Sequence, residues 1–123
     1  MGRILLVDDS GMTRFLLARF LTAGGHEIVG EAEDGREAIA KVRELDPDLV
    51  ILDLIMPHMK GLEVLEEIKK TSPRTRIVMC TGDHQEYTIR EAVRKGASGF
   101  IIKPFNRDVL IEEVNNILAG TPS

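Results

Sequence analysis

The sequence of 123 residues contains one cysteine, no tryptophan and no long apolar run. The single cysteine, Cys80, excludes an intramolecular disulfide. No segment approaches the roughly 20 apolar residues that a membrane-spanning helix needs, and the N-terminal run "ILLV" is too short for a signal peptide. We therefore expect a cytoplasmic protein without a membrane partner.

An excess of positive charge is also missing, because the formal net charge is −4. This balance argues against nucleic acid as a direct partner. Hydrophobic residues make up 43% of the chain and charged residues 29%, which is typical of a globular protein rather than a disordered one. The length predicts one domain over residues 1–123, in which the tail 119–123 is either a terminus or the start of a linker.

Short, continuously apolar segments alternate with segments of helical period along the whole chain. Strands are expected at residues 3–7, 28–32, 49–52, 76–80 and 99–102. Helices are expected at about residues 13–23, 34 or 35 to 45, 62–70, 87–95 and 107–118. Continuously apolar strands are typical of a sheet covered on both faces. Five strand–helix units therefore predict an α/β domain with a doubly wound, five-stranded parallel sheet and five helices.

The pattern also predicts which side chains lie inside. In the first and fifth helices, the side chains expected to face the core are Phe15, Leu16, Phe20, Val109, Leu110, Val114 and Ile117. Cys80 lies in an apolar strand and is expected in the core. The three histidines, His26, His58 and His84, lack the spacing of metal ligands and are expected at the surface.

Polar side chains follow four of the predicted strands. Ligands of doubly wound sheets bind outside the carboxyl ends of the strands, so these side chains are expected to converge. They are Asp8 and Asp9 after the first strand, Asp53 after the third, Thr81 after the fourth and Lys103 after the fifth. An aspartate after a strand is often only a helix N-cap, but capping does not explain all five residues at once.

Three clustered carboxylates repel one another, so either one of them is protonated or a cation lies among them. Oxygen ligands without clustered Cys or His favour Mg²⁺ over Zn²⁺. A phosphoryl group completes such a site, and it would explain an ammonium, Lys103, and a hydroxyl, Thr81. We expect Asp53 to be the nucleophile that accepts the phosphoryl group, with Asp8 and Asp9 holding the metal.

The motifs "VDD", "LDLIMPHMKG", "CTG" and "KPF" together resemble the receiver domain of two-component response regulators, close to the single-domain CheY type. The resemblance implies a flavodoxin-like sheet of order 2-1-3-4-5. It implies that Asp53 is phosphorylated by a histidine kinase, a phosphotransfer protein or a small donor such as acetyl phosphate. It also implies that Asp9 and Asp53 bind Mg²⁺ directly, that Asp8 acts through water, and that Ile55 contributes its backbone carbonyl.

The same resemblance assigns further roles around the phosphoryl group. Lys103 is expected to contact it, and the Lys103–Pro104 peptide bond is expected to be cis. Thr81 and Phe100 match the switch pair, which changes packing on phosphorylation and signals through the fourth helix, fifth strand and fifth helix. Ile55 and Asp83 are expected to tune the lifetime of the phosphoryl group. Such a protein catalyses only its own phosphorylation and dephosphorylation, and we expect a monomer, with dimerisation after phosphorylation left open.

Several alternatives remain at this point. A Mg²⁺-dependent phosphohydrolase of the haloacid dehalogenase group would carry its nucleophile after the first strand and a cap domain, and neither is found here. A flavodoxin-like nucleotide binder needs a phosphate-binding loop after the first strand, where "DDSGMT" places two anions. The domain could also be a receiver used without phosphorylation, or one excised from a multidomain response regulator. The stand-alone format favours chemotaxis, but other phosphorelays remain open.

Overall fold

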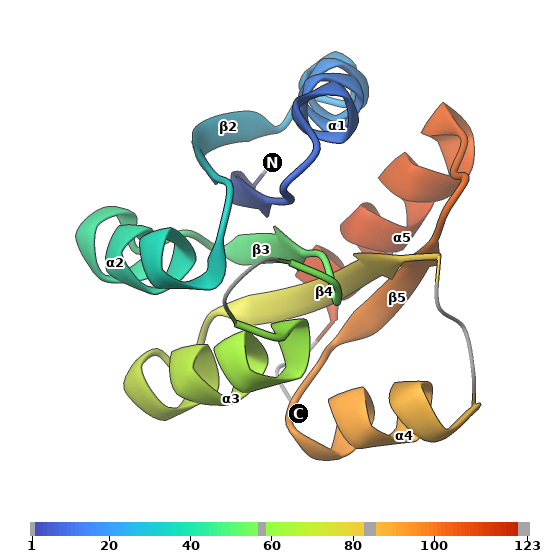
Figure 1. Cartoon of the computed structure of the whole chain (residues 1–123). Coiled ribbons are helices and arrows are strands. Elements are labelled where there is room, and N and C mark those ends of the chain that lie inside the picture. The colour runs from blue at the N-terminus through green and yellow to red at the C-terminus, as the bar shows by residue number, and fades with distance from the viewer. Residues whose placement is uncertain (1, 57–58, 83–85, 121–123) are drawn as a thin grey trace.

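The computed structural model describes residues 2–56, 59–82 and 86–120, in which five strands and five helices alternate along the chain (Figure 1). The strands are β1 (Arg3–Val7), β2 (Glu27–Ala32), β3 (Leu49–Leu52), β4 (Arg76–Thr81) and β5 (Gly99–Ile102). The helices are α1 (Gly11–Ala23), α2 (Gly35–Leu45), α3 (Gly61–Thr71), α4 (Glu86–Arg94) and α5 (Arg107–Ala119). Their bounds lie within one or two residues of the predictions, and none of the described helices is long and apolar enough to cross a membrane.

The strands form one parallel sheet in the order β2-β1-β3-β4-β5. The predicted fold class is therefore confirmed. The chain first extends the sheet from β1 to β2, then returns to the other side of β1 and continues through β3, β4 and β5. The strand order reverses between β1 and β3, which is where doubly wound sheets bind their ligands.

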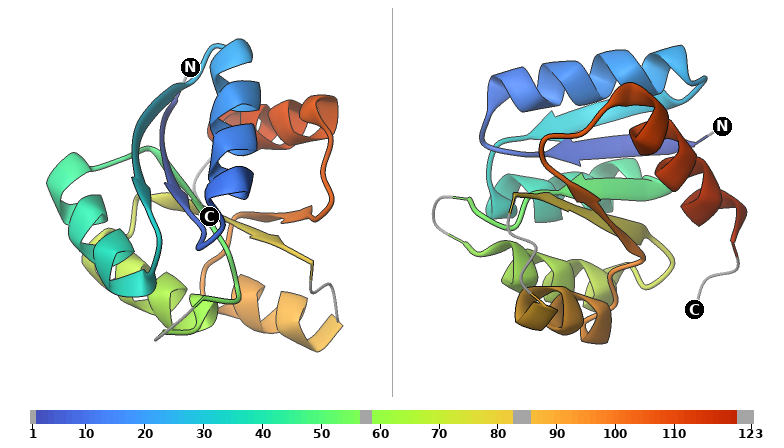
Figure 2. Two further views of the ribbon diagram at one scale, coloured as in Figure 1. Left: turned by 45° about the horizontal axis from the view of Figure 1, so that its top comes forward. Right: turned by 90° about the vertical axis from the view of Figure 1, so that its right-hand side faces the viewer.

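Helices cover both faces of the sheet (Figures 1 and 2). On β1, Ile4 and Leu6 pack toward α1 and α5, whereas Leu5 and Val7 pack toward the layer of α2, α3 and α4. Consecutive side chains of a strand point to opposite faces, so a strand buried on both faces must be apolar throughout. This requirement explains the continuous apolar runs of the sequence.

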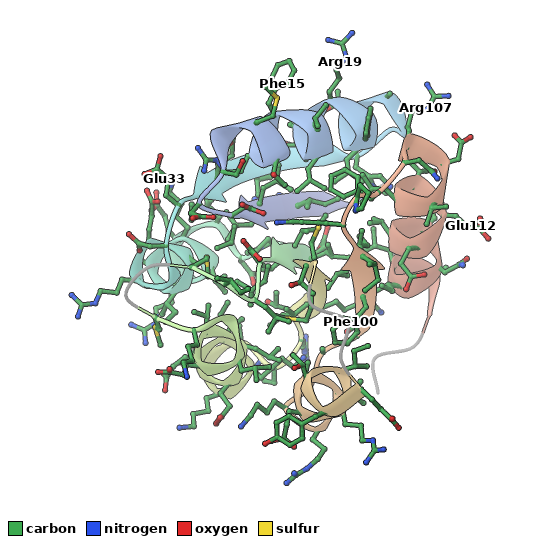
Figure 3. All side chains as sticks on the ribbon, turned by 45° about the vertical axis from the view of Figure 1, so that its right-hand side comes forward. Phe15, Arg19, Glu33, Phe100, Arg107 and Glu112 are labelled. Atoms are coloured by element: carbon green, nitrogen blue, oxygen red, sulfur yellow. The ribbon has the colours of Figure 1, made fainter. Side chains whose placement is uncertain are left out.

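Two of the predicted core residues are exposed instead. Phe15 on α1 is 57% exposed and Val109 on α5 is 55% exposed, so both predictions are wrong. In α1 the buried residues are Leu17 and Leu21, which lie four residues apart and therefore share one face of the helix. Figure 3 shows Phe15 on the side of α1 that faces away from the sheet.

The surface location expected for His26 is also wrong, because this residue is only 6% exposed. Its Nδ1 accepts a hydrogen bond of 3.0 Å from the backbone N–H of Gly2, and its Nε2 lies 2.7 Å from Oδ1 of Asn115. The histidine thus connects the start of β1 with α5. His58, His84, Asp83 and the end of the predicted tail, residues 121–123, lie outside the described residues.

Candidate functional site

The backbone brings four strand ends to one edge of the sheet. The N–H of Asp53 donates to the carbonyl of Val7 at 3.0 Å, so β3 delivers Asp53 beside the end of β1. The N–H of Lys103 donates to the carbonyl of Thr81 at 2.9 Å, which joins the ends of β5 and β4 in the same way. Residues far apart in sequence therefore meet because parallel strands end together.

Three of the predicted site residues form an acidic cluster. Carboxylate oxygens of Asp8, Asp9 and Asp53 all lie within 4.8 Å of one another. Asp8 and Asp53 are buried, with 1% and 6% of their surface exposed, whereas Asp9 is exposed. The cluster consists of hard oxygen donors only and opens to solvent on the side of Asp9. These residues fit a Mg²⁺ ion, which prefers a few carboxylates and retains several waters.

Lys103 supplies positive charge to this cluster. Its Nζ lies 2.9 Å from Oδ2 of Asp8 and 3.6 Å from Oδ2 of Asp53. Burial alone would lower the pKa of Lys103, but the hydrogen bond with Asp8 and the charges of Asp53 and Asp8 raise it above its usual value. The ammonium therefore stays charged and bridges the buried carboxylates.

One ammonium does not balance three carboxylates. Burial raises the pKa of Asp53, and the neighbouring charge of Asp8 raises it further. The hydrogen bond from Ile55 and the charge of Lys103 oppose this shift without cancelling it. The ionised cluster is thus unfavourable in the protein alone, and an added cation would relieve it.

Backbone N–H groups orient both buried carboxylates. Oδ1 of Asp8 accepts from the N–H of Ser10 at 2.9 Å, and Oδ1 of Asp53 accepts from the N–H of Ile55 at 3.2 Å. In each case the second oxygen, Oδ2, is the one that faces Lys103. The side chain of Ile55 is 70% exposed beside the site, and metal ligation by its carbonyl stays a prediction.

Gly61 begins α3 directly against the backbone of Asp53. A Cβ atom at this position would lie 2.5 Å from the Asp53 carbonyl oxygen and 2.5 Å from Cα of Leu54. The N–H of Gly61 donates to the carbonyl of Leu54 at 2.9 Å, which closes the loop between β3 and α3. The glycine of the "LDLIMPHMKG" motif therefore permits a backbone contact that any side chain would prevent.

The remaining predicted residues lie around this centre. Thr81 is 1% exposed at the end of β4. Thr81 lies two residues after Met79 in β4, so the two side chains point to the same face of the sheet. Phe100 of β5 pairs with Met79 and is partly buried against the apolar side chains on that face (Figure 3). The Lys103–Pro104 peptide bond is cis.

The sequence analysis missed one residue at the site, Arg14. Its side chain returns from α1 to the end of β1, where Nη1 donates to the carbonyl of Asp8 at 2.5 Å. Its Nε donates to Oε1 of Glu31 at 2.8 Å. No motif indicated this role. The sequence shows that an arginine lies near the start of a helix, but not which groups its side chain contacts.

The whole chain was also compared with known proteins. The model of the response regulator receiver domain family matches residues 4–115. The chain belongs to this family. It is 40% identical over 115 residues to the chemotaxis protein CheY of Thermotoga maritima, and the match covers 94% of this chain and 96% of that protein.

Solved structures of receiver domains agree with this assignment. The chemotaxis protein CheY4 of Vibrio cholerae superposes with a TM-score of 0.89 and 34% identity, covering 95% of this chain and 98% of that one. The CheX–CheY–BeF3–Mg²⁺ complex of Borrelia burgdorferi gives a TM-score of 0.91 and 32% identity, covering 94% and 87%. This receiver domain is therefore CheY-like, and it belongs to two-component signalling, in which a receiver works with a kinase or phosphotransfer partner.

Proposed function

We propose that this receiver accepts a phosphoryl group on Asp53 and signals in the manner of CheY. The observation that carries the proposal is the convergence of Asp53 with Asp8, Asp9 and Lys103 at the carboxyl edge of the sheet. The site offers a carboxylate nucleophile and a cationic side chain beside it, which are the groups that phosphoryl transfer to an aspartate needs.

In the proposed transfer, a carboxylate oxygen of Asp53 attacks the phosphorus of a phosphohistidine on the partner. A phosphorus–oxygen bond forms, the phosphorus–nitrogen bond breaks, and the imidazole leaves with the bonding electron pair and takes up a proton. Lys103, whose Nζ lies 3.6 Å from Oδ2 of Asp53, moves from the carboxylates to an oxygen of the arriving phosphoryl group. Hydrolysis by water later returns Asp53 to its carboxylate form.

Mg²⁺ fits the donor set of Asp9 and Asp53, with Asp8 acting through water and Ile55 through its carbonyl. The ion would neutralise charge on the carboxylates and on the transferring oxygens. The Borrelia burgdorferi complex contains Mg²⁺ together with BeF3, which supports the same requirement here.

We further propose that Thr81 and Phe100 carry the signal to the surface formed by α4, β5 and α5. Thr81 would turn toward the phosphoryl group, and Phe100 would turn inward into the vacated space. The surface already carries exposed apolar side chains that a partner could cover: Tyr87, Val93, Ile102 and Val109.

The phosphoryl donor in this proposal is a histidine kinase or phosphotransfer protein, and the chain acts on no substrate besides itself. Relatives named chemotaxis proteins favour a chemotaxis pathway over other phosphorelays. We propose a cytoplasmic monomer that docks its target through α4, β5 and α5 and contacts neither nucleic acid nor membrane directly.

The decisive experiment is incubation with acetyl phosphate and Mg²⁺ followed by intact-mass measurement. We expect the wild type and the control Asp48→Ala to gain the mass of one phosphoryl group, and Asp53→Ala to gain none. Labelling of Asp53→Ala, or no labelling of the wild type, would contradict the proposal. Continuous turnover of a phosphate ester would instead indicate a phosphohydrolase.

Ile55 and Asp83 are proposed to set the lifetime of the phosphoryl group. The exposed Ile55 side chain offers no polar atom that could orient an attacking water. We therefore expect Asp53-phosphate to decay more slowly in the wild type than in Ile55→Asn. The disappearance of the phosphorylated mass over time measures both rates. Equal or faster decay in the wild type would refute this role.

A further inference from the structure

Arg14 joins three separate groups through the three nitrogens of its guanidinium. Nε lies 2.8 Å from Oε1 of Glu31, Nη2 lies 3.5 Å from Oε1 of Glu33, and Nη1 donates to the carbonyl of Asp8 at 2.5 Å. The Arg14 side chain is only 13% exposed. An arginine can hold several acceptors in fixed directions because its guanidinium is planar and always charged.

These contacts surround the turn that carries the two acids. Asp8 follows β1 directly and still bonds with β2, through its N–H to the carbonyl of Ala32 at 3.1 Å. Its carbonyl is then taken by Arg14 rather than by the strand ladder. The backbone N–H of Arg14 donates to the carbonyl of Ser10 at 3.1 Å, so the same residue closes the first turn of α1. The segment from Asp8 to Ser10 is therefore fixed at both ends.

The carboxylate of Asp8 is oriented by the same network. The N–H of Ser10 reaches Oδ1 of Asp8 at 2.9 Å, and the Ser10 hydroxyl oxygen accepts from the N–H of Thr13 at 3.2 Å. A shift of the Asp8 carbonyl would move both the Ser10 amide and the Asp9 side chain beside it. Metal ions with strict geometry, such as Mg²⁺, are sensitive to shifts of this kind.

Arg14 is not placed to attract a phosphoryl group directly. Its charge faces Glu31 and Glu33, which offset it locally, and all three nitrogens have protein acceptors. Its influence on the site must therefore act through the position of the backbone.

We propose that Arg14, anchored by Glu31 and Glu33 on the segment at the end of β2, is a positioning residue that holds the Asp8–Asp9 turn ready for Mg²⁺. This inference rests on the proposed function, since it assumes that the acidic cluster binds the metal. It assigns a role in metal binding to a residue other than the three acids and Lys103. It also connects the edge strand β2 physically with the metal site.

The test is calorimetric titration with Mg²⁺ of the wild type, Arg14→Ala and Arg19→Ala. Arg19 lies on the same helix, points into solvent (Figure 3), and its removal changes the net charge equally. We expect Arg14→Ala to bind Mg²⁺ about tenfold more weakly and Arg19→Ala to stay within about twofold of the wild type, since a single exposed charge is largely screened. Equal affinities of the two variants would overturn the inference.

Amide hydrogen exchange in the metal-free proteins separates positioning from general loss of stability. Arg14→Ala should speed exchange at the Ser10 amide while leaving the amide of Val78 in β4 unchanged, whereas uniform acceleration would overturn the inference. If Arg14→Ala does not fold, Arg14→Lys decides, because a lysine keeps the charge but cannot reach Glu31 and the Asp8 carbonyl together. Failure of the wild type to bind Mg²⁺ would overturn the proposed function itself, so the two failures are distinguishable.

Discussion

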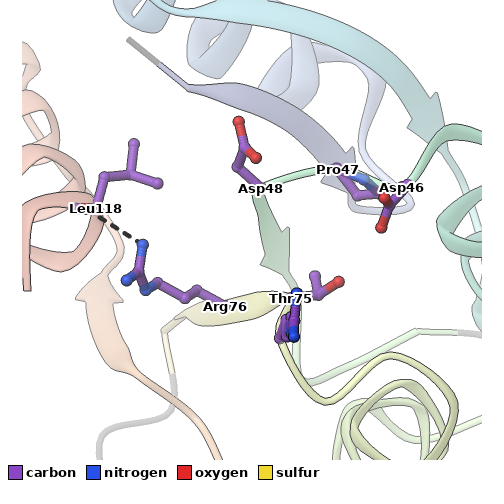
Figure 4. Close-up of a pocket in the computed structure, with 7 residues that line it drawn as sticks. Asp46, Pro47, Asp48, Thr75, Arg76 and Leu118 are labelled. Carbon is purple, nitrogen blue, oxygen red and sulfur yellow. Dashed lines mark hydrogen bonds between the residues drawn. The ribbon is translucent and has the colours of Figure 1, made fainter. Parts of the chain in front are cut away.

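Acidic side chains lie at both edges of the sheet: Asp8, Asp9 and Asp53 where strands end, and Asp46 and Asp48 where β3 begins. At the second edge, Oδ2 of Asp48 accepts from the N–H of Arg3 at 2.9 Å, and the Arg3 guanidinium donates to the carbonyl of Asp46 at 2.9 Å. A pocket of about 460 Å³ lies there (Figure 4). Its lining residues are Asp46, Pro47, Asp48, Arg74, Thr75, Arg76 and Leu118.

The two edges differ in how their charges are balanced. The pocket is lined by equal numbers of acids and bases, two aspartates and two arginines, and Arg76 donates to the carbonyl of Leu118 at 3.2 Å, which anchors the end of α5. At the carboxyl edge, three carboxylates cluster around one ammonium that pairs with Asp8 and Asp53, the two buried ones. Acidic residues alone therefore do not mark a site; buried charge of one sign without enough compensation does.

The largest expected effect is the response of stability to Mg²⁺. At a concentration about 100 times Kd, Mg²⁺ should raise the free energy of unfolding of the wild type by about 2.7 kcal/mol, and the melting temperature by on the order of 10 °C. Asp9→Ala should lose most of this shift because it removes a ligand, whereas Asp48→Ala should keep it. Thermal unfolding with and without Mg²⁺ measures both.

The same experiment tests whether Mg²⁺ binds at the carboxyl ends of the strands or at the pocket beside Asp48. If Asp48→Ala loses the Mg²⁺ response, the metal binds at the balanced edge and the contrast between the two edges is wrong. If Asp9→Ala retains the response, Asp9 is not a ligand of the metal. Na⁺ at matched ionic strength controls for screening of surface charge.

Glycine substitutions test whether the backbone is packed more tightly at the carboxyl edge than at the opposite end of the molecule. Gly61→Ala should lower the free energy of unfolding by about 1–3 kcal/mol, because the new Cβ would lie 2.5 Å from backbone atoms of Asp53 and Leu54. Gly120→Ala, at the opposite end of the molecule, meets its nearest atom at 3.4 Å and should change stability much less. Urea unfolding of both variants measures the difference, and equal losses would show that the contact at Asp53 is not restrictive.

The sequence predicted the elements of this fold well because their signals are local. Apolar runs, glycines and caps identify strands and helices, and parallel topology then brings Asp8, Asp53 and Lys103 to one edge. The side of α1 that packs on the sheet could not be predicted in the same way. Apolar residues occupy nearly every position of "FLLARFL", so the helical period does not distinguish Phe15 from Leu17.

Contacts between distant side chains were the second failure. Arg14 reaches Glu31 across 17 positions of sequence, and His26 reaches Asn115 across 89. Nothing in the neighbouring residues encodes these distances. They arise only after α1, β2 and α5 have packed, which is why the sequence analysis missed Arg14 and placed His26 at the surface.

The smallest expected effect is on the free energy of unfolding, which one aspartate-to-asparagine substitution at each edge should change in opposite directions. The pKa of Asp53 is raised by burial and by Asp8, so the native state binds the Asp53 proton more tightly than the unfolded state. The protonated Asp53 carboxyl therefore contributes its full stability below the ordinary pKa of 3.8. This contribution is lost as the pH rises through the raised pKa of the native state. Asp53→Asn removes this loss and should stabilise the metal-free protein slightly at neutral pH.

At the other edge, Asp48→Asn should destabilise the protein by a few tenths of a kcal/mol, because its carboxylate only accepts one hydrogen bond from the Arg3 backbone at an exposed position. Urea unfolding of both variants and the wild type between pH 3 and pH 8 measures the two effects. The stabilisation by Asp53→Asn should vanish at the acidic end, where the wild-type carboxyl is already protonated, and again at neutral pH once Mg²⁺ is added. A stabilisation that is constant over the pH range would show that the amide packs better than the carboxyl, and that excess charge does not distinguish the two edges.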